Sequence, residues 1–264
     1  MSNELEKRKQ TSLQMQVATD IPGFENMDDD LIIVPRMKIL QSMSDEVGED
    51  DQFQPGMIIN SLSKDILAKK GESIEVVPIL IGRSRIRFAP IGSNEGILCR
   101  SANGKFGEGE PGGDCSECPF AKWEGSEPPE CTDLINVVVV PLGLEDQFPV
   151  VLSFGRASFG IGRQFVNMMY MRRKSPWYFK YQIGAKFVKN DKGQFYVPTV
   201  KPSGTAPADI IEQMEIIYNS LASAGFEIHE DEEEIKSERA KMAQDNGMAE
   251  QPQPQQNKVP DPPF

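Results

Sequence analysis

Apolar residues recur along this chain in short runs that are separated by Gly, Pro, Asn and Asp, which is the pattern of β-strands. Pro35 argues that the first run is an edge strand, because proline cannot donate a ladder hydrogen bond. We expect a turn or bulge at Gly82. The predicted strands cover residues 31–40, 57–62, 74–81, 84–88, 134–142, 149–154, 177–189 and 194–201, the last two as a hairpin around residues 190–193.

Two segments follow a helical period instead. Residues 207–225 carry apolar side chains on one face, with a proline suited to the first turn and a glycine suited to the position after the last. Residues 158–172 also fit a helix, although Gly160 and Gly162 disfavour it. Strands with one or two helices predict a mainly β fold. A small Greek-key barrel fits this pattern, and a two-sheet sandwich fits nearly as well.

The pattern changes between residues 92 and 133, where Gly, Pro, Ser and acidic residues follow no period. We expect a domain over residues 31–226 that carries an insert over 92–133. Residues 1–30 look like a flexible acidic arm, and residues 227–264 form an acidic, Gln/Pro-rich tail that we expect to be disordered. The polar start of the chain is unlike a secretory signal, and no apolar run is long enough to cross a bilayer. We therefore expect a cytoplasmic protein.

Charge is distributed unevenly along the chain. The formal net charge of −12 comes from the two ends, whereas residues 149–203 hold ten basic residues and one acidic residue, a net charge of +9. A basic segment of this kind is the electrostatic signature of nucleic-acid binding, which the acidic average conceals.

All the cysteines of the chain lie in the aperiodic insert, as Cys99, Cys115, Cys118 and Cys131. Two thiolates separated by two residues can hold one tetrahedral ion across a tight turn, and the glycines and proline around this pair favour such a turn. Four thiolates would close a structural zinc site and stabilise an insert that has few apolar residues to bury.

An iron–sulfur cluster needs the same four ligands and remains an alternative. A redox pair is disfavoured, because the motif does not open a helix after a strand. Catalytic zinc is disfavoured because the single histidine, His229, sits in the acidic tail and no catalytic metal motif is present. We therefore expect no enzymatic activity.

The stretch RSRIRF places Arg83, Arg85 and Arg87 at period two, so that a strand would present all three on one face. Three like charges repel one another, and a polyanion lying across that face would relieve the repulsion.

The stretch RRKSPWYFKYQ adds cations and rings within one segment. Aromatic rings stack on unpaired bases while cations follow the phosphates, so interleaving the two on strands suits single-stranded nucleic acid. An ordinary half-buried strand is the alternative, and strand register decides which rings are exposed. The expected DNA-binding residues are Arg83, Arg85, Arg87, Arg156, Arg163, Arg172, Arg173, Lys174, Trp177, Tyr178, Phe179, Lys180 and Tyr181.

The chain ends in VPDPPF. This ending resembles the tip of bacterial single-stranded-DNA-binding proteins, although Pro262 replaces an apolar residue and most acids lie further back, at 230–234. The resemblance implies that Asp261, Pro262, Pro263 and Phe264 dock on replication or recombination proteins. It also implies that the acidic tail competes with DNA.

The order of VPRMKILQ, INSLS, IEVVPI, GEPGGDCSECPFAKW, PPECTDLINVVVVPL, PVVLSF and NDKGQFYVPTV resembles phage-encoded single-stranded-DNA-binding proteins. This resemblance implies an OB-like barrel with a zinc-binding insert.

We therefore expect a bacteriophage protein that binds and protects single-stranded DNA in replication or recombination within the host cytoplasm. A zinc-containing protein-interaction or transcription adaptor is the main alternative. A metal-dependent nuclease is disfavoured, because the clustered carboxylates at 45–51 and 230–234 look like solvated loops.

Overall fold

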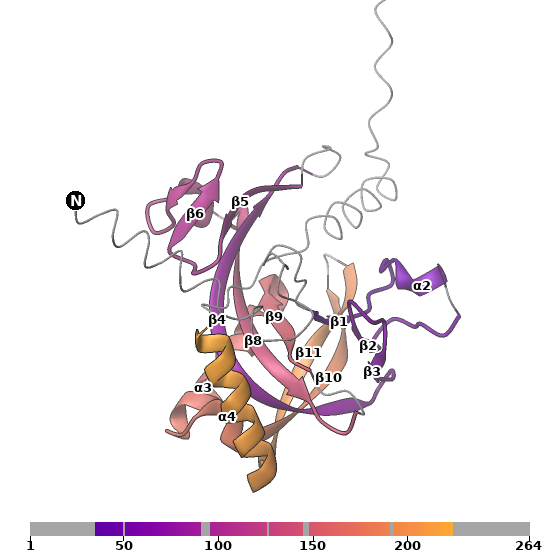
Figure 1. Cartoon of the computed structure of the whole chain (residues 1–264). Coiled ribbons are helices and arrows are strands. Elements are labelled where there is room, and N and C mark those ends of the chain that lie inside the picture. The colour runs from indigo at the N-terminus through magenta and orange to yellow at the C-terminus, as the bar shows by residue number, and fades with distance from the viewer. Residues whose placement is uncertain are drawn as a thin grey trace, which may run out of the picture.

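The computed structural model describes residues 35–49, 51–90, 96–125, 127–144, 148–190 and 193–223, in which antiparallel strands are the main secondary structure (Figure 1). The helices are α2 (Glu46–Glu49), α3 (Phe159–Met171) and α4 (Ala208–Ser223), with short 3-10 helices η2 (Pro119–Ala121), η3 (Arg156–Ser158) and η4 (Pro176–Tyr178). The strands are β1 (Met37–Ile39), β2 (Ile58–Asn60), β3 (Ile66–Ala68), β4 (Ser73–Phe88), β5 (Ile97–Ser101), β6 (Phe106–Gly109), β7 (Gly113–Asp114), β8 (Cys131–Pro141), β9 (Val150–Gly155), β10 (Phe179–Asn190) and β11 (Gly193–Thr205).

The long strand β4 organises the larger sheet. It pairs with β8 along most of one edge, and with β10 and β5 at the two ends of the other edge. A register shift between Pro78 and Leu80 marks a bulge, whereas Gly82 continues the ladder with β8. The predicted break at Gly82 is therefore wrong, and the two strands predicted here are one. The irregularity lies at Pro78 because proline has no N–H to donate to the ladder.

A smaller sheet, formed by β1, β2 and β3, lies beside the larger one. A parallel bridge joins Arg36 to Val151 on β9. On the other side, the Gln41 amide donates to the carbonyl of Tyr196 on β11 at 3.1 Å and accepts from its N–H at 2.7 Å. One bridge and one side-chain clasp are not a strand ladder. The described strands thus form open antiparallel sheets, and the closed OB-like barrel that we expected is wrong for this part of the chain.

Side chains on the two faces of the larger sheet belong to different cores. On one face, Ile135, Val137 and Val139 of β8 join a core to which α3 contributes Phe165 and Met169. On the other face, Val140 joins a core with Trp177 and α4. Because successive residues of a strand point to opposite faces, the Val run of β8 is buried on both sides. The predicted buried strand is confirmed.

Both predicted helices are present as α3 and α4. The predicted apolar face of α4 is also confirmed, because Met214 is buried and Ile210, Ile217 and Leu221 pack beside it. The strands missed in the sequence are β3, β5, β6 and β7. They are two to five residues long, which is too short to show a clear period, and β6 and β7 also consist largely of glycine and acidic residues.

The described parts of the insert extend from the far end of β4 and β8, where β5, β6 and β7 form a small meander (Figure 1). The arm over residues 1–30 and the tail over residues 227–264, including the tip Asp261–Phe264, lie outside the described residues.

Candidate nucleic-acid interface and cysteine cluster

The arginines at period two lie on one face of β4, as predicted, because the ladder with β8 is regular from Leu80 onwards. Their repulsion is relieved within the protein itself. Arg83 forms a bidentate ion pair with Asp133 on β8, in which its Nε donates to Oδ1 at 2.8 Å. Arg85 approaches the same carboxylate, with Nη2 3.6 Å from Oδ2. The hydrogen bond to Asp133 holds the pKa of Arg83 above its usual value.

Arg87 is also paired. Its Nη2 donates to the Glu130 carboxylate at 2.9 Å, and its guanidinium carbon lies 3.5 Å from the ring centroid of Phe120. Carboxylates therefore supply at least part of the countercharge that we assigned to a polyanion. This face carries less uncompensated positive charge than the sequence alone indicates.

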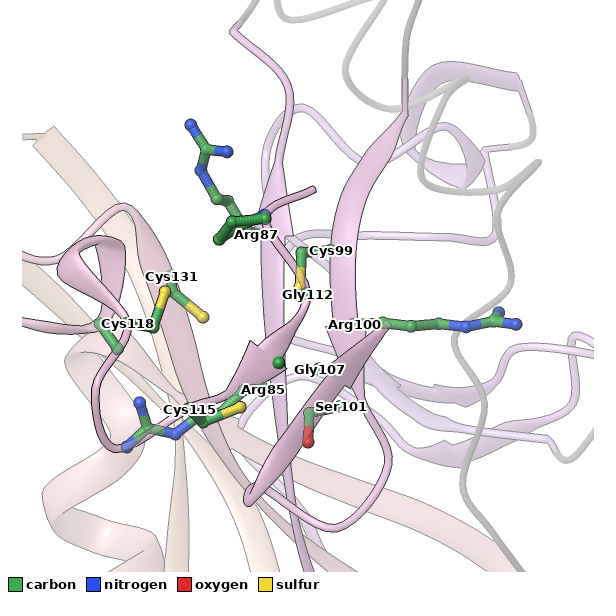
Figure 2. Close-up of a pocket in the computed structure, with 13 residues that line it drawn as sticks. Arg85, Arg87, Cys99, Arg100, Ser101, Gly107, Gly112, Cys115, Cys118 and Cys131 are labelled. Carbon is green, nitrogen blue, oxygen red and sulfur yellow. The ribbon is translucent and has the colours of Figure 1, made fainter. Parts of the chain in front are cut away.

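The end of this arginine face meets the cysteines. Arg87 lies opposite Cys99 on β5 and opposite Cys131 on β8, so these three side chains share one face. All four cysteines line one cavity of about 10 Å³, together with Arg85 and Arg87 (Figure 2). A cavity of this size holds a single water-sized sphere. The topology thus brings four thiols from three parts of the insert around one small space.

The environment of Cys131 shows the proximity of the other thiols. Burial raises the pKa of the Cys131 thiol to about 11, and the charges of Cys118, Cys115 and Cys99 act in the same direction, whereas Arg85 opposes them. Among the described residues, no three ligand side chains converge closely enough to hold a metal ion as they stand. Metal ligation would therefore require the thiols to turn toward the shared cavity.

Glycines leave room for this cluster. A Cβ on Gly107 would lie 2.9 Å from the sulfur of Cys99. Gly112 adopts φ +69, and a Cβ there would lie 3.0 Å from the carbonyl oxygen of Gly109. The glycines before the Cys-x2-Cys pair thus allow the turn that the sequence indicated.

A second group of cations lies at the end of α3. Arg173 and Lys174 are exposed, and neither forms an ion pair with a carboxylate in the described part of the chain. Lys174 lies 5.4 Å from the ring centroid of Tyr178. The guanidinium of Arg172 lies 4.2 Å from the ring of Phe179 and 5.5 Å from that of Tyr181. Arg172 therefore covers rings of the core, whereas its two successors face solvent.

The aromatic segment does not form the stacking surface that we expected. Trp177 is 7% exposed and packs against Tyr218 of α4 at 4.7 Å between ring centroids. It precedes β10 in η4 and does not begin the strand. Tyr181 is fully buried against Phe165. Burial raises the pKa of the Tyr181 phenol, although the charge of Arg172 opposes this.

These two rings are therefore unavailable to bases in this conformation, because they complete the two cores of the sheet. Tyr178 and Phe179 are half-buried. This segment contains both rings and cations because some of its side chains complete the cores and others face solvent. The sequence alone did not show which side chains belong to which group.

The remaining predicted cations are dispersed. Arg156 is exposed, and its Nε donates to the Thr132 hydroxyl at 3.2 Å. Arg163 is exposed on α3. Lys180 forms an ion pair with Glu75 at 2.9 Å.

Ile81 connects the arginine face to the end of α3. It lies on the same face of β4 as Arg83, two residues away, and it lines a groove with Tyr170, Arg173 and Lys174. Two residues of this site were not predicted. Tyr170 is 80% exposed, and nothing in the helical pattern of residues 158–172 indicates this exposure. Asp133 lies opposite Arg85 because β8 begins at Cys131 and not at the predicted residue 134.

The fold and this site define a mainly β protein in which a cationic, partly aromatic surface adjoins a four-cysteine insert. The chain matches the Pam3 phage gp34-like protein family over residues 6–227, most of its length, and it belongs to this family. The family description indicates a phage protein. No curated protein and no solved structure matches the chain. Among the helices that the structure describes, none is long and apolar enough to cross a membrane.

Proposed function

We propose that this protein binds single-stranded DNA without catalysis, and that it protects such DNA during phage replication or recombination in the host cytoplasm. The observation that supports this best is the surplus of cations in the described part of residues 149–203. These residues contain no carboxylate side chain, and among their cations only Lys180 forms an ion pair within the described chain. Unpaired cations favour a polyanionic partner because binding releases condensed counterions.

Phosphates would follow the cations at the end of α3 and continue toward Arg83, Arg85 and Arg87. The unpaired Arg173 and Lys174 would contribute most, because their charges are not already compensated by carboxylates. Arg156 and Arg163 could extend the contact.

We further propose that Cys99, Cys115, Cys118 and Cys131 hold structural zinc. They line one cavity of about 10 Å³. The Nε of Arg85 is buried there without a hydrogen-bond acceptor among the described residues. A metal-bound thiolate would supply that acceptor, and Arg85 would offset part of the negative charge of a tetrathiolate site. Bound zinc would hold the insert beside the cationic surface.

The acidic tail over residues 227–264 would compete with DNA for the cations, and the Phe-terminated tip would recruit replication or recombination proteins. Deleting residues 227–264 should then raise DNA affinity, most clearly at low salt, where exposed charges are least screened. If the deletion leaves DNA affinity unchanged at low salt, the tail does not compete with DNA for the cations.

An adaptor function is the second candidate, because the insert exposes two large rings. Trp123 is 68% exposed and Phe106 is 62% exposed. Exposed aromatic side chains are frequent anchors of protein interfaces. In that case the insert would bind a protein and the cations would meet acidic residues of the partner.

Binding of a dye-labelled oligo-dT, followed by anisotropy over a range of salt concentrations, tests the proposed function. Quenching of tryptophan fluorescence is a poorer readout, because Trp177 is buried and Trp123 lies in the insert. We expect tight binding that weakens steeply with salt and a lower affinity for duplex DNA of the same length. Absence of binding at low salt, with and without the tail, would reject the proposal in favour of the adaptor.

A further inference from the structure

A groove of about 640 Å³ lies where the end of α3 meets η4 and β4. Its apolar part is formed by Ile81, which is partly exposed on β4, and by Val166 and Met169, which belong to the core under α3. Its volume is within the range of sites that hold small organic groups. Among the described residues, no carboxylate side chain lines it.

Tyr170 stands at this groove with its ring largely in water. It is 80% exposed, whereas Met169 beside it is 2% exposed. No ring contact joins Tyr170 to another side chain in the described part of the protein. The ring therefore has a free face, unlike Trp177 and Tyr181, whose faces are occupied in the cores.

Cations surround the same groove. Arg173 and Lys174 line it, and neither has a carboxylate partner among the described residues. Arg173 adopts φ +52, a left-handed conformation that non-glycine residues rarely adopt, at the turn that ends α3. The site thus combines a free ring, an apolar floor and two unpaired cations.

We propose that this groove binds an unpaired nucleobase, which stacks on Tyr170 while Arg173 and Lys174 contact the flanking phosphates. The inference rests on the proposed function and assigns its stacking residue. A free ring beside unpaired cations is the combination that single-stranded nucleic acid requires. An acidic peptide would pair with the two cations, but it would not supply a planar group to stack on the Tyr170 ring and cover the apolar floor.

The test compares the full chain with Tyr170→Ala and Tyr170→Phe, using an oligo-dT and an abasic oligonucleotide of equal length. Tyr170→Ala should weaken oligo-dT binding roughly 5- to 150-fold, the range for loss of one stacked base. It should leave affinity for the abasic strand within about twofold, since that strand offers only phosphates. Tyr170→Phe should retain oligo-dT binding, because it keeps the ring.

Gln164→Ala is the control, because Gln164 is exposed on the same helix α3 but does not line the groove, so it should leave the affinity for both strands unchanged. Thermal unfolding of each variant shows whether it is folded. If the wild type binds neither strand, the proposed function fails and the inference fails with it. If the wild type binds oligo-dT and Tyr170→Ala binds it equally well, only the inference is overturned. An equal loss on both strands would also overturn it, since the ring would then not act through a base.

Discussion

The arginine face of β4 and the end of α3 carry the same sign of charge, but they differ in what compensates it. On β4, Arg83 and Arg85 share the Asp133 carboxylate, and Arg87 pairs with Glu130. At the end of α3, Arg173 and Lys174 have no carboxylate partner in the described part of the chain. A regular cationic pattern in a strand is therefore not by itself a binding surface.

The difference has a physical origin in topology. An antiparallel neighbour can place a carboxylate directly opposite each cation of a strand, and β8 does so at Asp133. Cations at a helix end have no such register partner, and residues 149–203 contain one acidic residue that could serve. Charge that remains uncompensated after folding is the better guide to a polyanion.

Loss of the metal site should give the largest effect on stability. This effect should be confined to the insert and the cysteine end of β4 and should not reach the end of α3. With zinc bound, Cys118→Ser removes a ligand and should destabilise the insert by several kcal/mol, since metal binding and folding of such sites are coupled. Hydrogen exchange should rise in β5 to β7 and at the cysteine end of β4, while α3 stays protected. Metal analysis of the purified protein gives the complementary readout.

Ser116→Ala is the control for this substitution, because Ser116 is exposed between the two cysteines of the pair and has no thiol. It should keep both the metal content and the exchange pattern. A wild-type protein without bound metal, or a Cys118→Ser variant with unchanged exchange, would contradict a structural zinc site.

Removing the unpaired cations should give the next largest effect. The double variant Arg173→Gln/Lys174→Gln should bind oligo-dT about tenfold or more weakly at low salt. Its log–log salt slope should become shallower by about 1.4, because each lost phosphate contact contributes roughly 0.7 for single strands. Anisotropy titrations over several salt concentrations measure both quantities.

The matched comparison is Arg83→Gln, which removes a paired cation. It should reduce affinity less than either single substitution at the end of α3. If Arg83→Gln has the larger effect, the ion pairs with β8 open when DNA binds, and the comparison between the two regions is wrong.

Releasing the paired arginines should have a smaller effect of opposite sign. Asp133→Asn removes the carboxylate that Arg83 and Arg85 share, so it should raise oligo-dT affinity by about two- to fivefold at low salt, with little change at high salt. Asp209→Asn, an exposed carboxylate in the first turn of α4, controls for the change in net charge alone. Equal gains from both variants would show that only overall charge matters.

Much of the fold followed from periodicity. The Val run of β8, the hairpin of β10 and β11, and the apolar face of α4 were predicted because each is long and regular. The bulge at Pro78, the small strands of the insert and the open sheets were not, because they depend on pairing between distant segments. The shared face of Arg83, Arg85 and Arg87 was predicted correctly, because these residues lie in a long, regular strand.

The candidate site was predicted less well. Grouping of the cysteines followed from their spacing, and the structure brings them to one cavity, whereas metal binding stays a prediction. Trp177 and Tyr181 were misassigned to the surface, because sequence did not show that Trp177 packs against Tyr218 of α4 on one face of the sheet and Tyr181 against Phe165 of α3 on the other. Tyr170 was missed because a helical pattern alone does not reveal which side chains of α3 the fold leaves exposed.

The smallest expected effect on DNA affinity concerns Lys180. It pairs with a carboxylate, unlike the other described cations of residues 149–203. Hydrogen bonds from Ser203 and Lys180 hold the pKa of Glu75 below its usual 4.5, although burial opposes them. A carboxyl group whose pKa is lowered on folding stays ionised at neutral pH, and the stability it contributes is lost only as the pH falls through its folded-state pKa. Glu75 therefore compensates Lys180 throughout the neutral range.

Lys180→Gln should accordingly weaken oligo-dT binding less than Lys174→Gln at pH 7. This difference in lost affinity between the two variants should persist at pH 5 at constant ionic strength. Once the pH falls through the lowered folded-state pKa of Glu75, this carboxyl group becomes protonated, Lys180 loses its partner, and the difference between the two variants should narrow. Anisotropy titrations at pH 7, at pH 5 and further into the acid range measure this difference directly. Equal losses from the two variants at pH 7 would mean that a carboxylate partner does not decide which cations contact DNA, and the contrast between β4 and the end of α3 would lose its explanation.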